Sequence, residues 1–218
     1  MSEVNRKQGD ALFAHPLYLV TDDQQSLTEL VEVVTDAVQS NVIGMVQIRE
    51  KHGDVRSFIE RAQAIKPILA KHKVPLIIND RVDVALAVDA DGLHLGQSDM
   101  PVAMARKLLG SDKILGLSVE TMAQLEEAQS MDLDYLGVSA IFATPTKTNT
   151  INHWGLDGLT QAVLRSRLPL VAIGGINQTN IAQVAHTKVA SIALVSAICH
   201  AKSPRQASVA LNNQIKAG

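Results

Sequence analysis

Strand-like and helix-like segments alternate along this chain, and we therefore predict a single (β/α)8 TIM barrel with a short N-terminal extension. Eight short apolar runs have strand character, and the segments between them show helical periodicity. The length of 218 residues suits a small barrel, since such barrels begin near ~200 residues. We expect residues 1–14 to form the extension and residues 15–218 the barrel.

The predicted strands are β-branched or Leu-rich, and their order alternates with the helical segments, which favours parallel pairing with right-handed crossovers. An open doubly wound sheet is the alternative. Its usual Gly-rich turn after the first strand is absent, because the chain continues there as Thr21-Asp22-Asp23. In chain order the predicted strands are Tyr18–Val20, Met45–Ile48, Leu76–Ile78, Leu93–Leu95, Ile114–Leu117, Tyr135–Val138, Leu170–Ile173 and Ile192–Val195.

Helical periodicity is clearest in the first two connecting segments, where apolar residues recur on one face. The apolar face of the first segment contains Leu27, Leu30, Val31, Val34 and Val38. The apolar face of the second contains Phe58, Ile59, Ala62, Ile65 and Leu69. The longest stretch without a pattern is 139–155, and a long polar loop in a compact fold is more often functional than idle.

Composition excludes several classes of protein. The net charge of -2 and the aromatic content of 3% argue against binding to nucleic acid. No apolar run reaches the ~18 residues that suggest a membrane span. The polar start Met1–Asp10 lacks a signal core, and the single cysteine, Cys199, rules out an internal disulfide, so we expect a cytoplasmic protein. The sequence does not decide between a monomer and a homo-oligomer.

Polar residues follow the predicted strands, at the edge where active sites of such barrels lie. Gln47-Ile48-Arg49-Glu50-Lys51 comes first. Alternation places Gln47 and Arg49 on one face, with Ile48 on the other. Arg supplies a fixed fork for phosphate and Lys a mobile charge, although a solvated salt-bridge cluster explains the pentapeptide equally well.

Two carboxylates follow two successive predicted strands, in Asn79-Asp80 and in Gly96-Gln97-Ser98-Asp99. Neighbouring strands lie ~4.8 Å apart, so both carboxylates can reach one divalent cation that also carries phosphates. Helix capping is the alternative for each, since Asp80 precedes a helical pattern and Asp99 precedes Pro101. As a pair, they indicate a metal–diphosphate site.

The interior face of the next strands is polar in places. His94 alternates with Gly92 and Gly96, so we expect an interior histidine that is satisfied by neighbours and is not a metal ligand. Ser118 shares a face with Gly116, and its hydroxyl either points into the mouth or bonds to a neighbour.

A second anion site is predicted from the later loops. Thr144-Pro145-Thr146-Lys147 offers hydroxyls and a cation, unless it is only a flexible surface loop. Gly174-Gly175 and Val195-Ser196 follow the last two strands, where barrels often bind phosphate through backbone N–H groups. Gly-Gly alone also marks any tight turn. Two anion sites at one mouth predict two phosphorylated substrates and transfer of a group away from diphosphate.

These motifs, in this order, resemble the thiamine-phosphate synthase (thiamine-phosphate pyrophosphorylase) family. The resemblance covers nearly the whole barrel, from Tyr18 to Ile198. The matching motifs are Tyr18-Leu19-Val20-Thr21-Asp22, Gln47-Ile48-Arg49-Glu50-Lys51, Asn79-Asp80, Gly92-Leu93-His94-Leu95-Gly96-Gln97-Ser98-Asp99, Gly116-Leu117-Ser118, Thr144-Pro145-Thr146-Lys147, Ile173-Gly174-Gly175-Ile176 and Ser196-Ala197-Ile198.

The resemblance implies a transferase that joins 4-amino-2-methyl-5-hydroxymethylpyrimidine diphosphate to 4-methyl-5-(2-phosphoethyl)thiazole, which gives thiamine phosphate and diphosphate. It implies one Mg²⁺ per site, held by Asp80 and Asp99 and arriving with the diphosphate. The pyrimidine diphosphate would contact Gln47, Ile48, Arg49, Glu50, Lys51, Asn79, Ser118 and Lys147. The thiazole phosphate would contact Thr144, Pro145, Thr146, Gly175, Val195 and Ser196. Catalysis would depend on Arg49, Lys51, Ser118 and Lys147.

The chain departs from the family pattern at Glu120, where the family commonly has a His, and in the unusual segment 148–154. Two other functions remain open: a thiazole tautomerase-like isomerase, and a non-catalytic regulatory barrel that binds thiamine phosphate. Retention of Asp80, Asp99, Lys51 and Lys147 argues against both, because neither needs a complete leaving-group site.

Overall fold

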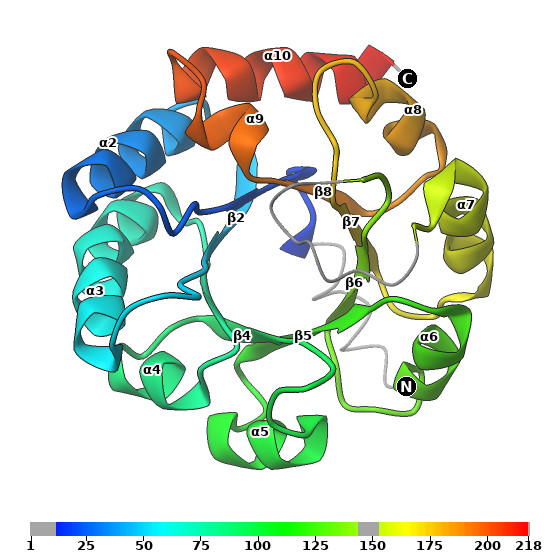
Figure 1. Cartoon of the computed structure of the whole chain (residues 1–218), viewed down its shortest axis with the longest axis horizontal. Coiled ribbons are helices and arrows are strands. Elements are labelled where there is room, and N and C mark those ends of the chain that lie inside the picture. The colour runs from blue at the N-terminus through cyan, green and yellow to red at the C-terminus, as the bar shows by residue number, and fades with distance from the viewer. Residues whose placement is uncertain (1–11, 144–152, 218) are drawn as a thin grey trace.

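The computed structural model describes residues 12–143 and 153–217, and it shows a closed barrel of eight parallel strands surrounded by helices (Figure 1). The strands follow one another around the barrel in chain order, and the last pairs with the first. This arrangement confirms the predicted TIM barrel and excludes the open doubly wound sheet.

All eight predicted strands are confirmed, and their ends differ from the prediction by two residues at most. The second strand, for example, begins at Ile43 and not at Met45. The strands are β1 Leu17–Val20, β2 Ile43–Ile48, β3 Leu76–Asn79, β4 Gly92–Leu95, β5 Ile114–Val119, β6 Tyr135–Ser139, β7 Leu170–Ile173 and β8 Ser191–Leu194.

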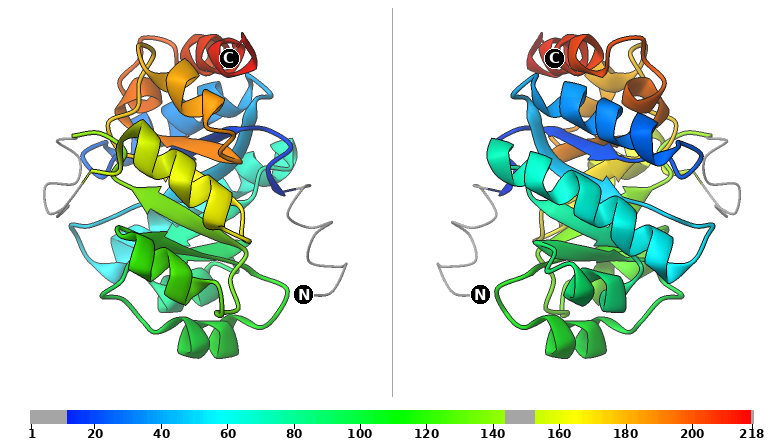
Figure 2. Two further views of the ribbon diagram at one scale, coloured as in Figure 1. Left: turned by 90° about the vertical axis from the view of Figure 1, so that its right-hand side faces the viewer. Right: turned by 90° about the vertical axis from the view of Figure 1, so that its left-hand side faces the viewer.

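Helices fill the connections and cover the outside of the barrel, with α2 and α3 side by side (Figure 2). The described helices are α2 Leu27–Val38, α3 Val55–His72, α4 Val82–Ala87, α5 Val102–Leu109, α6 Met122–Ala128, α7 Gly155–Arg165, α8 Ile181–His186, α9 Ser196–Cys199 and α10 Pro204–Ala217. Within the described ranges, no helix is both long and apolar enough to cross a membrane.

The starts of the two longest early helices are fixed by local side chains. Ser26 and Glu29 form a capping box on α2, in which the Glu29 N–H donates to Ser26 Oγ at 3.2 Å and the Ser26 N–H donates to Glu29 Oε2 at 2.8 Å. Asp54 caps α3 by accepting from the Ser57 N–H at 2.9 Å. These caps fix the residue at which each helix begins.

Two buried layers result. The larger one lies between the barrel wall and the helices and contains Leu30, Val34 and Ile65. The smaller one lies inside the barrel and contains Tyr18, Val20, Met45, Ile77, Tyr135, Val171 and Ala193. Leu12 and Phe13, just before β1, pack against this inner layer. The C-terminal ends of the strands are therefore left to form a mouth above a filled interior.

Candidate active site

A cavity of about 510 Å³ occupies the mouth of the barrel, a size suited to small-molecule ligands. Its walls come from strand ends and the loops that follow them, because parallel strands bring all their C-terminal ends to one edge. Ten of the residues that the sequence predicted for the site line it: Gln47, Arg49, Lys51, Asn79, Asp80, Asp99, Ser118, Gly175, Val195 and Ser196.

Two predicted side chains point elsewhere. Ile48 is fully buried in the layer between barrel and helices, as strand alternation requires. Glu50 accepts a hydrogen bond from Arg61 Nε of α3 at 2.8 Å, and burial raises the pKa of Glu50 against the opposing effect of Arg61. Neither residue is among those that line the cavity. Thr144, Pro145, Thr146 and Lys147 lie outside the described residues.

The two predicted carboxylates meet at the mouth. Asp80 follows β3 in a left-handed conformation with φ of 64°, and its carboxylate forms an ion pair with Lys51 Nζ. Asp99 Oδ2 accepts a hydrogen bond from the Gly96 N–H at 2.6 Å. Neither caps a helix, because the N-cap residues of α4 and α5 are Arg81 and Pro101, and neither helix has a side-chain capping bond.

Asp80 and Asp99 bring two acidic groups close together. Burial raises the pKa of Asp99, and the adjacent Asp80 carboxyl raises it further. Among the described residues no cluster of three or more His, Cys, Asp or Glu side chains could hold a metal. Two hard oxygen ligands fit Mg²⁺, which keeps waters and takes its other ligands from substrate phosphates.

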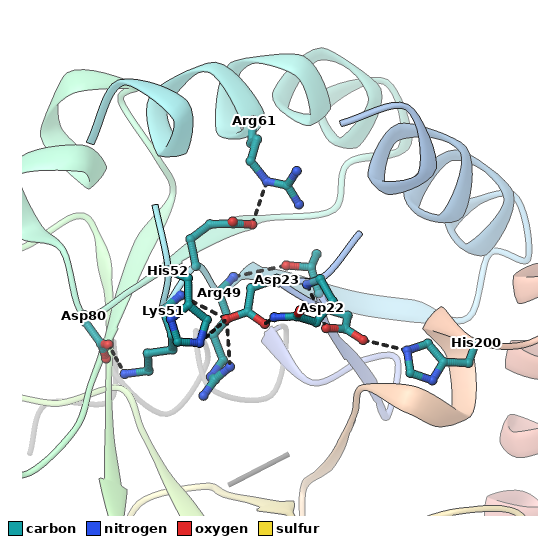
Figure 3. A network of polar contacts seen from close by, with 11 residues as sticks. Asp22, Asp23, Arg49, Lys51, His52, Arg61, Asp80 and His200 are labelled. Carbon is teal, nitrogen blue, oxygen red and sulfur yellow. Dashed lines mark hydrogen bonds and ion pairs between the residues drawn. The ribbon is translucent and has the colours of Figure 1, made fainter. Parts of the chain in front are cut away.

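Two cations lie beside this pair: Lys51 contacts Asp80, and Arg49 contacts Asp23 (Figure 3). Asp23, in the loop after β1, accepts from the Lys51 backbone N–H at 3.2 Å and lies 3.9 Å from Arg49 Nη1. Burial opposes ionisation of Asp23, but the bonds from Gln24 and Lys51 and the charge of Arg49 outweigh it and lower its pKa. Asp23 thus holds the loop that carries both cations, a role that the sequence did not suggest.

Asn79 carries an unused donor. The side chain is 7% exposed, and its Nδ2 has no hydrogen-bond partner among the described residues. A buried N–H group without a partner costs free energy. Asn79 lines the cavity beside Asp80, so a rotation of its side chain would let this donor reach an anionic ligand there.

We expect Asn79→Leu to weaken binding of a diphosphate ligand about tenfold while leaving the free energy of unfolding unchanged or higher, since the orphaned donor disappears. Calorimetric titration with diphosphate and Mg²⁺, together with denaturant unfolding, measures both. A less stable protein with unchanged binding would make Asn79 a structural residue.

The far side of the mouth is built from backbone and a hydroxyl. Gly174 and Gly175 follow β7 with φ of 104° and 68°, a conformation that favours glycine. A Cβ on Gly175 would lie 2.6 Å from the carbonyl oxygen of Ala143, so the close approach also requires glycine. Ser196 begins α9 directly after β8. This half contains no carboxylate and is separate from the Asp80–Asp99 half.

Several cavity residues were not predicted as ligand contacts, and three of them form one hydrogen-bonded group. Tyr18, Tyr135 and His94 join Gln47 to Ser118 through hydrogen bonds across the barrel interior. The expectation of a satisfied interior histidine is confirmed, with partners at both ring nitrogens. The sequence signal for the tyrosines was weak: they are the only two in the chain, and both lie in apolar strands.

The ends of the long loop after β6 are tied to the barrel. The Trp154 N–H donates to the Ala140 carbonyl and the Gly155 N–H donates to that of Ile141, both at 3.0 Å. Ala143, the last described residue before the gap, lines the cavity. Glu120 also lines the cavity, and its backbone N–H donates to Gln124 Oε1 at 2.7 Å.

Comparison with known proteins gives a consistent result. Residues 17–198 match the family model described as thiamine monophosphate synthase. The thiamine-phosphate synthase of Vibrio campbellii is 66% identical over 195 residues, which is 89% of this chain and 95% of that protein. That of Albidiferax ferrireducens is 49% identical, covering 92% of each chain. A solved thiamine phosphate pyrophosphorylase from Pyrococcus furiosus superposes with a TM-score of 0.84 at 34% identity, covering 96% of this chain and 98% of its own.

Proposed function

The chain belongs to the thiamine monophosphate synthase family and is a thiamine-phosphate synthase, and we propose that its chemistry takes place in the mouth cavity. The observation that carries this proposal is the composition of the cavity wall. Carboxylates and cations, Asp80, Asp99, Arg49 and Lys51, line one part, and Gly175 and Ser196 line another.

The first part suits the pyrimidine diphosphate. Asp80 and Asp99 would hold one Mg²⁺ that arrives with the diphosphate, and the metal would neutralise charge on the leaving oxygens. Arg49 and Lys51 face the same space and stabilise negative charge as it develops. Asn79 Nδ2, which has no hydrogen-bond partner among the described residues, would supply a further donor after a rotation of its side chain.

The reaction then needs no protein nucleophile. The amino group of the pyrimidine stabilises positive charge at its methylene carbon, so the carbon–oxygen bond to diphosphate can break before the thiazole nitrogen attacks. The bonding pair leaves with the diphosphate oxygen, and the nitrogen lone pair forms the new carbon–nitrogen bond. The protein contributes positioning and exclusion of water, which would otherwise capture the cation.

The second part suits the thiazole phosphate. Gly174 and Gly175 allow a phosphate to approach the backbone, and Ser196 adds a hydroxyl donor. Thr144–Lys147 would complete both parts by resemblance to the family. Because both substrates enter one cavity, the thiazole nitrogen can lie close to the pyrimidine methylene carbon.

The test is a two-substrate assay with purified protein and Mg²⁺, in which thiamine phosphate and diphosphate are measured together. We expect equal amounts of both products and neither product when one substrate is omitted. Isomerisation of the thiazole alone would favour a tautomerase. Binding of thiamine phosphate by a folded protein that makes no product would favour the regulatory barrel.

A further inference from the structure

A chain of four hydrogen bonds crosses the interior beneath the cavity and connects two proposed substrate contacts. Gln47 Nε2 donates to Tyr18 Oη at 2.8 Å, and Tyr18 Oη lies 3.0 Å from Tyr135 Oη. Tyr135 Oη lies 2.9 Å from His94 Nδ1, and His94 Nε2 lies 2.9 Å from Ser118 Oγ. Five strands contribute one residue each: β1, β2, β4, β5 and β6.

The interior is shaped around this chain. Tyr18 and Tyr135 are at most 1% exposed, and burial raises the pKa of both phenols, which therefore stay protonated. A Cβ on Gly116 would lie 2.2 Å from Tyr135 Cζ and 2.6 Å from His94 Nδ1. Glycine at this position makes room for both rings, which stack with centroids 5.4 Å apart.

Each hydrogen bond in this series has a defined donor and a defined acceptor. In the amide orientation of this structure Gln47 Nε2 faces Tyr18 and can only donate, so Tyr18 accepts at that end and gives its own proton to Tyr135. Tyr135 in turn donates to His94 Nδ1. A neutral imidazole that accepts at Nδ1 carries its proton on Nε2, and it therefore donates to Ser118 Oγ.

The opposite direction is unfavourable. If His94 Nδ1 donated to Tyr135, Tyr135 would donate to Tyr18, which already accepts from Gln47. The Tyr18 proton would then lack an acceptor among the hydrogen bonds that the described residues make. A buried hydroxyl proton without an acceptor costs roughly 1–3 kcal/mol.

We propose that Tyr18, Tyr135 and His94 are positioning residues that fix the polarity of the two substrate contacts at their ends. His94 is the neutral Nε2–H tautomer, Gln47 presents its amide oxygen as an acceptor, and Ser118 presents its hydroxyl proton as a donor. The fitting ligand edge has an amino donor facing Gln47 and an acceptor atom facing Ser118. This deepens the proposed function, on which it rests, by explaining how an aminopyrimidine is selected.

The tautomer is tested directly by ¹⁵N NMR of the protein labelled at histidine, with His94→Gln to assign the signals of His94. We expect a protonated Nε2 and an unprotonated Nδ1 at neutral pH in the free protein. A Nδ1–H tautomer, or a ring protonated at both nitrogens, would overturn the proposal. This readout does not depend on catalysis.

Selectivity is tested with two Mg²⁺-loaded ligands in the absence of thiazole: the aminopyrimidine diphosphate, and an analogue with hydrogen in place of the amino group. We expect the wild type to prefer the amino compound about tenfold or more in Kd. In Tyr135→Phe the preference should fall to within about threefold, because the directed chain is cut. Tyr18→Phe is the second variant, should Tyr135→Phe fail to fold.

Ile77→Val is the matched control, since Ile77 lies in the same inner layer without a polar group, and its preference should equal that of the wild type. An unchanged preference in a folded Tyr135→Phe protein would overturn the proposal. Failure of the proposed function is distinguishable, because it would show as absence of thiamine phosphate from the wild type whatever the tautomer of His94.

Discussion

Asp99→Asn is expected to lower kcat/KM about 10²-fold or more and to raise the Mg²⁺ concentration that half-saturates the enzyme. The asparagine oxygen can still accept from the Gly96 N–H, so the turn after β4 is kept. The substitution removes one of the two charges that we propose hold the cation, and with it part of the proposed stabilisation of the leaving group. Initial rates across a Mg²⁺ series measure both quantities.

The same substitution should not destabilise the free protein. The pKa of Asp99 is raised by burial and by Asp80, so its charged form is disfavoured in the empty site, and removing the charge relieves repulsion. Asp83→Asn is the matched control, because Asp83 is an exposed carboxylate of α4 paired with Arg81. Near-normal rates with unchanged Mg²⁺ dependence in Asp99→Asn would reduce Asp99 to a structural role in the turn.

Lys51→Gln is expected to lower kcat about 10²- to 10³-fold, which corresponds to about 2.7–4 kcal/mol of transition-state stabilisation. Lys51 lines the cavity and pairs with Asp80, so in the proposed mechanism its ammonium would lie where negative charge develops on the departing diphosphate. The KM for the pyrimidine diphosphate should change less, because the interaction strengthens in the transition state.

Metal binding should respond to Lys51→Gln in the opposite direction from turnover. Without the ammonium, the charge of Asp80 is no longer neutralised, and Mg²⁺ alone should bind more tightly. Lys66→Gln is the control, since Lys66 of α3 contacts the carbonyls of Val88 and Asp89 away from the cavity. A raised KM with unchanged kcat would assign Lys51 to ground-state binding only.

The strands and the edge that bears the site could be predicted because local patterns determine them. Strand parity alone places Gln47 and Arg49 toward the cavity and Ile48 away from it, as observed. Parallel strands place Asp80 and Asp99 at one edge whatever the barrel radius. Such features depend only on the order of residues within each strand and on the direction of the strands.

Features that depend on contacts across the barrel could not be predicted. Tyr18 and Tyr135 are 117 residues apart and meet only because the sheet closes. Glu50 pairs with Arg61 of the next helix, and no pattern within the pentapeptide Gln47–Lys51 indicates that partner. Asp23 likewise acts through a long-range contact, since it accepts from the backbone N–H of Lys51 in the loop after β2. Long-range pairs of this kind require the structure.

The central proposal is that Mg²⁺ and diphosphate bind together between Asp80, Asp99 and the cations Arg49 and Lys51. Isothermal titration of the free enzyme with diphosphate, with Mg²⁺ and with chelator in place of Mg²⁺, tests this directly. We expect Mg²⁺ alone and diphosphate alone to bind weakly, and the two together to bind at least about tenfold more tightly, with this gain lost in Asp99→Asn. Diphosphate affinity that is the same with chelator as with Mg²⁺ would contradict the account.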